Sequence, residues 1–432
     1  MATISENDWV IVKKDDNLKV LKIRSERPVW MEKMKFVFDG AVGHSYGTKF
    51  EVGNGALVKF VQPNDTPESC LTDMEERKVA DNRNLHDCDT NQKLSKEDIE
   101  AMRAEGLHGE AIIGKLIQNS ETFDKKTEFS KEKYIKKKKK KFTKIITILK
   151  PTLRLLCEMH FNKNKTKICG MRIDSLGQIL SHANVRAGSN VIVVESCGGL
   201  VLGAVLERLG GLGKVFDFHP GNSQTRIMDG MPISKEYIDE HVTSISLSHM
   251  QTLVSGQKLP DPTPVENDED AVLGIDDKSE EEAANNQANS STVNVDKKSN
   301  APGKRKLTTE QIRLIIERKK KRIDQINEGM DDLRSNSVDS LICATKFDPT
   351  PIVMKLIKFL KPSRPFAVYS QYKEPLMECF LRLKETRKVV FLRLSETWLR
   401  EYQVLPKRTH PEINMSGGGG YLLTGTTVLN ND

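Results

Sequence analysis

The sequence is poor in several features that mark particular classes of protein. Its 432 residues contain only seven cysteines, with no Cys-x-x-Cys pair and no histidine cluster beside them. This argues against a structural zinc site and favours a reducing compartment. No apolar run approaches the roughly 20 residues that a membrane-spanning helix needs, and the first eight residues do not form a signal peptide. We therefore expect an intracellular protein with no metal site and no membrane contact.

Length and charge bound the organisation of the chain. A chain of 432 residues is too long for one typical domain and suggests two, joined by linkers. A hydrophobic content of 37% and a charged content of 29% suit a soluble protein with polar insertions. The formal net charge is +7. Because the charges are unevenly spread, their distribution is more informative than their sum.

The first 60 residues alternate apolar and polar side chains in short pieces, which is the pattern of half-buried strands. These pieces are residues 9–12, 18–23, 35–38, 49–52 and 57–60. Five or six strands within about 55 residues predict a small β-barrel or sandwich. We assign a barrel to an N-terminal domain of residues 1–85. Such modules bind nucleic acid or carry a partner surface, and both uses have similar weight here.

A helical, lysine-rich connection is expected over residues 86–165. A polar, turn-rich stretch at 63–93 precedes two short helical segments, at 96–103 and 110–120, which we expect to bridge the two domains. Residues 125–150 then contain twelve lysines and only two glutamates. Within them lies an unbroken run of six: Lys136, Lys137, Lys138, Lys139, Lys140 and Lys141.

A polyanion is the obvious partner of this lysine run. A solvated helix face and a nuclear import signal are the two alternative interpretations. The run leads directly into residues 142–156, whose apolar side chains have helical spacing. A basic helix fixed to a folded core binds phosphate better than a free tail does. We therefore favour nucleic-acid contact, with import open as a second use.

A strand–turn–helix–strand unit occupies residues 190–221. Residues 191–194 form a short β-branched apolar run, typical of a strand buried on both faces. Residues 200–209 have helical spacing, glycines end that helix, and residues 215–218 begin a second strand. This order is half of a nucleotide-binding α/β sheet. An ordinary βαβ unit with no nucleotide site is the alternative.

The turn of this unit resembles the cofactor turn of class I methyltransferases, Glu-x-Gly-x-Gly-x-Gly. From Glu195, the three glycine positions hold Cys197, Gly199 and Val201. Glycines let the backbone approach the cofactor and adopt positive φ, so we expect the side chains of Cys197 and Val201 to project into the cofactor space. Asp217 is expected at the tip of the second strand, where an acid binds the cofactor ribose in that family.

A second polar insertion is expected at residues 257–306. Its first part, residues 261–282, carries ten acids and one lysine, and its second part is rich in Asn, Ser and Ala. Such a composition cannot bury enough apolar surface to become ordered. We therefore predict a disordered loop inside the second domain, residues 166–432, rather than a domain boundary.

A long helix is predicted over residues 308–334. Its apolar stripe comprises Ile312, Ile316, Ile323, Ile326, Met330 and Leu333, and we expect it to pack on its own domain, with a partner helix as the alternative. A basic cluster at 318–322 supplies Arg318, Lys319 and Lys320 as further candidates for phosphate contact or import.

The rest of the chain completes an α/β sheet. Strands are predicted at residues 340–347, 366–369, 389–394 and 421–428, helices at 351–360 and 375–384, and a closing turn at 417–420. The predicted fold is thus a small N-terminal β-barrel followed by a Rossmann-like class I methyltransferase domain with a degenerate cofactor site.

Several segments together resemble one family, the non-catalytic subunits of the eukaryotic tRNA adenine-N1 methyltransferase. They are residues 172–180, 194–199, 370–375, 394–405 and 415–423. The resemblance implies pairing with a catalytic homologue as a two-plus-two heterotetramer in the nucleus. It further implies that the complex methylates N1 of the T-loop adenosine at tRNA position 58, with S-adenosylmethionine held by the catalytic partner and no cofactor here.

The fourth strand supports a non-catalytic assignment. The catalytic relatives carry Asp-Leu-Pro at its tip, whereas this chain has Thr345 and Lys346 there. A lysine repels the sulfonium of the methyl donor and accepts no proton from an exocyclic amine, but it can contact a tRNA phosphate. Asp348 lies nearby and could restore an acid if the loop is shifted.

Three functions are therefore weighed. A tRNA-binding subunit with no catalytic or cofactor-binding residues of its own is favoured. An active methyltransferase with an unusual cofactor turn is the second, and Asp217 is its best support. A translation-initiation scaffold without RNA contact is the third, and the lysine-rich stretches disfavour it.

Overall fold

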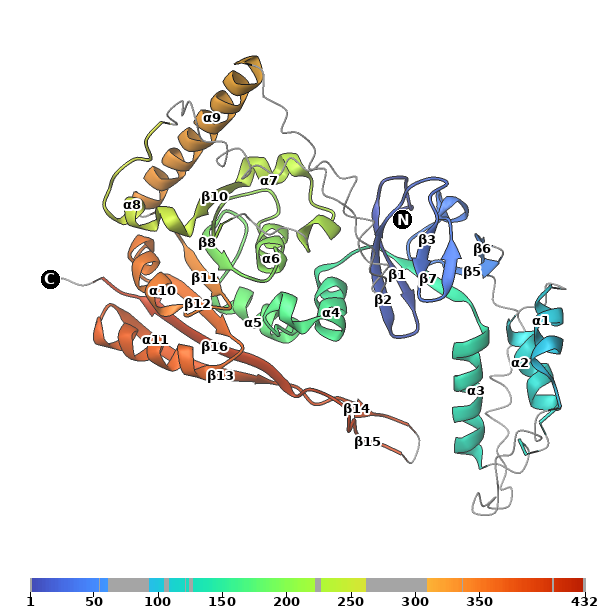
Figure 1. The fold of residues 1–432 in the computed structure, drawn as a ribbon. Coiled ribbons are helices and arrows are strands. Elements are labelled where there is room, and N and C mark those ends of the chain that lie inside the picture. The colour runs from blue at the N-terminus through green and yellow to red at the C-terminus, as the bar shows by residue number, and fades with distance from the viewer. Residues whose placement is uncertain are drawn as a thin grey trace, which may run out of the picture.

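The computed structural model describes most of the chain (Figure 1). The described residues are 2–53, 55–60, 93–104, 109–120, 122–123, 127–221, 227–261, 309–335, 337–405 and 408–429. The polar stretch expected at 63–92 and the insertion from residue 262 onward lie outside them. The insertion was expected to begin at residue 257, but residues 257–261 contact the long helix: Arg334 donates to the Gln257 carbonyl, and Leu259 N–H donates to the Asn327 side chain.

The N-terminal strands form a five-stranded antiparallel sheet of order β2-β1-β7-β5-β6 and a separate two-stranded hairpin, β3-β4. The strands are β1 (Trp9–Lys14), β2 (Asn17–Lys22), β3 (Val29–Met31), β4 (Met34–Phe36), β5 (Lys49–Gly53), β6 (Ala56–Lys59) and β7 (Ile145–Leu149). Alternate residues such as Val10, Val12, Ile146 and Ile148 are buried in their common core. Closure of these strands into a barrel stays a prediction.

The strand β7 corrects the sequence prediction of a helix over residues 142–156. Helix α3 (Glu128–Phe142) ends at Phe142, and Thr143 takes an extended conformation while its N–H and hydroxyl donate to the Lys139 carbonyl. Residues 145–148 are Ile-Ile-Thr-Ile, and β-branched side chains fit a pleated strand better than a helix. Pairing on both sides, with β1 and β5, decides the conformation.

The helical segments form a module that is inserted between β6 and β7. Helices α1 (Lys96–Ala104), α2 (Gly109–Gln118) and α3 share a small core that includes Met102, Ile112 and Phe142. The module lies on the side of the N-terminal sheet away from the α/β domain (Figure 1). It is therefore a projection from the sheet, and the expected bridge between domains is wrong. The actual connection is β7 followed by α4 (Leu153–Lys163).

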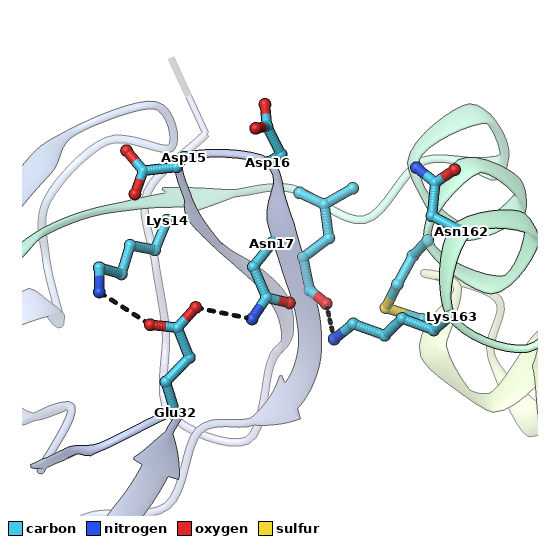
Figure 2. Close-up of a pocket in the computed structure, with 9 residues that line it drawn as sticks. Lys14, Asp15, Asp16, Asn17, Glu32, Asn162 and Lys163 are labelled. Carbon is cyan, nitrogen blue, oxygen red and sulfur yellow. Dashed lines mark hydrogen bonds and ion pairs between the residues drawn. The ribbon is translucent and has the colours of Figure 1, made fainter. Parts of the chain in front are cut away.

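The N-terminal sheet is fixed to α4. Ile11 and Leu18 share the core cluster that contains Leu156 of α4. Beside this contact, Lys163 donates to the main-chain carbonyl of Leu18, at the edge of a cavity of about 260 Å³ (Figure 2). On the other side of the cavity, Glu32 accepts hydrogen bonds from both Lys14 and Asn17. We regard this cavity as a joint between the two domains.

The C-terminal domain is a seven-stranded sheet of order β10-β9-β8-β11-β12-β16-β13. Its strands are β8 (Asn190–Glu195), β9 (Lys214–His219), β10 (Val242–Ser246), β11 (Ser340–Ala344), β12 (Pro365–Ser370), β13 (Val389–Trp398) and β16 (Gly418–Thr427). The first five strands are parallel, and β16 lies antiparallel between β12 and β13. The parallel part has the doubly wound order of nucleotide-binding sheets, so the predicted Rossmann-like domain is confirmed.

Helices cover both faces of this sheet. One core cluster joins α4, α5 (Ile173–His182) and α6 (Leu200–Leu209) to one face. The other joins α8 (Met250–Val254), α9 (Thr309–Arg334), α10 (Thr350–Leu356) and α11 (Lys373–Glu385) to the opposite face. Helix α7 (Lys235–His241) precedes β10. In the described part of the chain no helix is long and apolar enough to cross a membrane.

The two last long strands differ from their predictions. Residues 418–420, expected in a closing turn, begin β16, and a Cβ on Gly419 or Gly420 would overlap Thr397 or Tyr369. These glycines therefore serve close packing. Strand β13 continues past the predicted end at residue 394 to Trp398. Beyond it, the short hairpin of β14 (Tyr402–Gln403) and β15 (His410–Pro411) extends away from the sheet (Figure 1).

The expected docking of the long helix on its own domain is confirmed for its C-terminal half. Met330 and Leu333 are fully buried and Ile326 nearly so, while Ile316 and Ile323 are half-buried. The side chain of Ile312 lies outside the described residues. Only the second half of the stripe thus provides the packing that holds α9.

Met330→Ala should destabilise the protein by about 2–5 kcal/mol, because it leaves a cavity under α9. Leu314→Ala is the matched control, since Leu314 lies on the same helix and is 50% exposed. Urea unfolding measures both. Equal midpoints for the two variants would contradict the docking of α9.

Candidate functional site

The candidate nucleotide crevice lies where β8 turns into α6. Gly198 and Gly199 have φ of 69° and 86°, the left-handed region that glycine adopts without strain. Cys197 and Val201 are fully buried in the core, and the Cys197 thiol faces the Ala344 carbonyl at 3.7 Å. The expectation that these two side chains project into the cofactor space is wrong, because the turn directs both into the domain.

The turn is instead covered by Ile227. Its N–H donates to the Gly198 carbonyl at 2.9 Å, and its Cδ1 lies 3.2 Å from the position that a Cβ on Gly198 would occupy. Ile227 is 5% exposed, so its side chain belongs to the core rather than to a mobile lid. The sequence gives no signal for this contact, because residue 227 is distant in the chain and unremarkable in composition.

The N-terminus of α6 is also occupied. The Glu195 carboxylate accepts the N–H groups of Val201 at 3.2 Å and Leu202 at 2.8 Å. Burial, aided by the charge of Asp217, raises the pKa of Glu195 to about 7, against the lowering effect of these N–H donors. Free N–H groups at a helix N-terminus form an anion site in many nucleotide-binding folds. Here two of them are already bonded to the chain's own carboxylate.

Asp217 does not lie at the strand tip. It is the fourth of six residues in β9, pairs with Val193 and Ser244 across the sheet, and is 3% exposed. The Ser244 hydroxyl donates to its carboxylate at 3.4 Å. The residue at the tip is His219. The expected ribose-binding acid is therefore inside the strand, two residues before the crevice.

The tip of β11 carries a cation and no free acid. Lys346 is exposed, and the preceding Thr345 is buried, with its hydroxyl donating to the Phe347 carbonyl at 2.9 Å. Asp348 accepts the Thr350 N–H at 2.9 Å, at the start of α10. Burial, followed by the charge of Asp348, raises the pKa of Cys379 on α11 to about 12.

Lys346 acts electrostatically on a buried thiol beside the glycine turn. A hydrogen bond with Cys197 lowers the pKa of Cys169, and the charge of Lys346 lowers it further. Cys169 packs in the cluster of α4, α5 and α6. Asp348 is engaged at the start of α10, where it accepts the Thr350 N–H. Among the described residues, no three His, Cys, Asp or Glu side chains form a cluster that could hold a metal ion.

The six-lysine run occupies the C-terminal half of α3. Lys136, Lys137, Lys139 and Lys141 are exposed. Lys138 is half-buried, with its ammonium 5.1 Å from the centre of the Tyr134 ring. The side chain of Lys140 lies outside the described residues. The helix thus presents a row of solvated ammonium groups, and its aromatic side anchors it to the helical module.

The second basic cluster lies on the exposed half of α9. Arg318 and Lys320 are exposed, Lys319 is half-buried, and Lys320 is 3.8 Å from the Asp261 carboxylate. Helices α3 and α9 lie at opposite ends of the molecule (Figure 1). The structure therefore does not bring the predicted tRNA-binding residues into one patch. Arg322 belongs to the same basic cluster but was not among the predicted phosphate contacts. It lies on α9 next to β10.

Comparison with known proteins gives, among others, two relatives by sequence and one solved structure with the same fold. It is 40% identical over 450 residues to the mouse protein named tRNA (adenine(58)-N(1))-methyltransferase non-catalytic subunit TRM6, covering 99% of this chain and 88% of that one. The protein of the same name from Dictyostelium discoideum is 35% identical over 432 residues, covering 98% and 79%. A solved S-adenosylmethionine-dependent O-methyltransferase from Thermotoga maritima shares the fold, with a TM-score of 0.52 at 12% identity over 100% of this chain and 96% of that one.

The family assignment rests on both kinds of similarity. Residues 3–299 match the model of the Gcd10p family, and the mouse and Dictyostelium relatives extend the match along nearly the whole chain. The chain belongs to the Gcd10p family.

Proposed function

We propose that this chain is the non-catalytic, tRNA-binding subunit of a heteromeric tRNA (adenine(58)-N(1))-methyltransferase. The complex forms N1-methyladenosine in the T-loop of tRNA, acts in the nucleus and is built as a two-plus-two heterotetramer. The names of the two relatives support the subunit assignment. The nuclear location and the stoichiometry rest on the family resemblance alone, and closure of the N-terminal strands into a barrel rests on their alternating sequence pattern.

The observation that carries the proposal is the closed cofactor turn. Ile227 covers Gly198, and Glu195 occupies the start of α6. A cofactor that lies along this turn needs bare backbone there. The tip of β11 carries Lys346 instead of a carboxylate, so it offers no proton acceptor there. S-adenosylmethionine is therefore bound by the catalytic partner, and this chain holds no cofactor.

Binding of tRNA falls to the periphery of the molecule. The basic helix α3 projects from the N-terminal sheet on a module of its own (Figure 1). Lys346 and the cluster of Arg318, Lys319 and Lys320 add cations on the α/β domain. Contacts to phosphates orient an RNA without reading its sequence. Widely spaced cations suit a large folded RNA better than a small anionic ligand.

The catalytic partner docks on the β13 edge of the sheet and its extension. This region exposes several large apolar side chains, and a contiguous exposed apolar patch marks a protein–protein interaction site. They are Phe391 at 84%, Trp398 at 69%, Tyr402 at 56%, Val404 at 76% and Ile413 at 84%. Edge strands also offer unpaired backbone groups.

Trp398→Ala should reduce co-purification of this chain with a second methyltransferase-fold chain that carries an intact glycine turn and Asp-Leu-Pro. The matched control is Trp30→Ala, because Trp30 is 55% exposed on the N-terminal hairpin. Loss of the partner with Trp30→Ala alone would move the interface to the N-terminal hairpin of β3 and β4. Absence of any such partner from the wild-type preparation would refute the subunit proposal.

Replacing the six lysines 136–141 by alanine should weaken tRNA binding by the complex and flatten its salt dependence. Each lost phosphate contact lowers the slope of log K against log salt by about 0.7–0.9. The six-arginine variant keeps the charge and should bind nearly as the wild type does. An affinity that is unchanged in the alanine variant across a salt titration would reject this role for α3.

Lys346→Ala should lower tRNA affinity or the methylation rate of the complex while leaving its assembly intact. Lys346 is exposed, so the substitution removes a cation without opening a core cavity. Lys235→Ala on α7 is an equally exposed control. Filter binding and methyl transfer measure the effect, and wild-type values for both in the Lys346→Ala complex would discard this contact.

A further inference from the structure

A buried histidine ends strand β9. His219 is 5% exposed, and neither of its ring nitrogens has a hydrogen-bond partner in the described part of the chain. Burying a polar ring without a partner costs free energy, and such groups in folded proteins usually mark an absent water, ion or ligand. His219 also stands at the carboxyl edge of a doubly wound sheet, where these folds bind their ligands.

A second histidine reaches the same edge. Strand β10 pairs with β9 so that Ser246 lies opposite His219. The chain then turns through one 3-10 segment, Leu247–His249, so His249 follows three residues after Ser246. His249 is half-buried, and its Nδ1 is buried without a partner among the described residues. Strand pairing therefore brings two under-bonded imidazoles to one end of β9 and β10.

Helix α9 runs antiparallel to these strands. Asp332 forms an ion pair of 2.7 Å with Lys214, the first residue of β9. One turn earlier on the helix, a Cβ on Gly329 would overlap Thr243, the second residue of β10. Residues nearer the N-terminus of α9 therefore lie nearer the carboxyl ends of β9 and β10.

This direction places Arg322 beside the histidines. Seven residues of helix separate Gly329 from Arg322, a rise of about 10.5 Å. Three residues of strand separate Thr243 from Ser246, a rise of about 10 Å. Arg322 is thus level with Ser246 and with its partner His219. Arg322 also lines a groove between α9 and residues 239–244, whose lining includes the side chains of Asp239 and Glu240.

Electrostatics agree with this placement. Burial lowers the pKa of His219 and of His249, and the charge of Arg322 is the next cause of the lowering for both. Interaction with the Gly221 backbone partly offsets the lowering of the His219 pKa. Because the pKa of both histidines lies below the ordinary histidine value, both are neutral at pH 7. Arg322 is exposed and has no ion pair within the described residues, whereas Lys320, on the same helix, faces Asp261.

We propose that His219, His249 and Arg322 form a phosphate-binding site at the carboxyl edge of β9 and β10. A guanidinium offers a fork of donors to a phosphate, and each neutral imidazole offers one N–H. Arg322 and His249 are reached from solvent, and His219 forms the buried floor. The site lies outside the closed turn of Gly198. We assign the phosphate to the tRNA backbone, and this assignment rests on the proposed function.

The test follows the histidine ring signals of the full-length chain, labelled at the Cε1 carbon, by NMR. Inorganic phosphate should shift the signals of His219 and His249 and leave that of His410, exposed on β15, unmoved. Arg322→Gln should weaken the apparent phosphate affinity at least tenfold. Arg313→Gln is the matched control, because Arg313 is exposed on the same helix. Shifts that are absent, or that are equal in Arg322→Gln and wild type, would overturn the site.

Adding tRNA to the complex separates the two sources of phosphate. Shifts of the same two signals, together with a salt slope for tRNA binding that is lower by about 1 in Arg322→Gln, support a backbone phosphate. A response to inorganic phosphate with none to tRNA overturns the RNA source. Suppose that the salt slope of tRNA binding is unchanged in Arg322→Gln while replacing lysines 136–141 by alanine lowers it. In that case this inference fails and the proposed function stands. If the complex binds no tRNA at all, the proposed function fails by itself.

Discussion

The hydrogen bond from Ile227 N–H to the Gly198 carbonyl is the constraint on which this structure depends. It draws the segment after β9 onto the glycine turn, where an active methyltransferase keeps backbone free for its methyl donor. Met228 and Met231 follow and pack into the same core cluster. The turn thus keeps its positive-φ glycines, whose backbone geometry the β8–α6 connection still requires. The glycine turn of a nucleotide-binding scaffold is thus retained, with Ile227 packed against it.

Closing the crevice changes what the rest of the chain can do. The sheet and its two helical layers form a frame, and in the proposed subunit the polar groups at the carboxyl edge of the sheet serve no cofactor. Charged and apolar side chains meanwhile gather on the periphery, on α3, on α9 and along the β13 edge. Such a distribution suits a protein that positions an RNA and a partner while the reaction takes place on the partner.

Local patterns predicted the centre of the α/β domain well. The β-branched run of β8 and the helical spacing of α6 predicted this strand–helix unit correctly, because the apolar periodicity of each segment matches its burial in the structure. Strand β7 was missed because apolar residues in so short a run fit a helix as well as a strand, and pairing with β1 and β5 decided it.

The candidate site was less predictable than the fold. Substituted glycine positions correctly drew attention to the turn, but the direction of Cys197 and Val201 depends on backbone dihedrals that composition does not encode. Ile227 covers the turn through a contact between segments distant in sequence. Asp217 lies inside β9 because the strand continues to His219, and strand ends are poorly marked by a short apolar pattern.

Calorimetric titration of the purified chain with S-adenosylmethionine tests the central claim most directly. The closed turn predicts no saturable heat at donor concentrations up to about 1 mM, which corresponds to binding weaker than about −4 kcal/mol. The same titration on the complex with its catalytic partner is the positive control. It should give saturable binding of S-adenosylmethionine. Saturable micromolar binding to this chain alone would contradict the account.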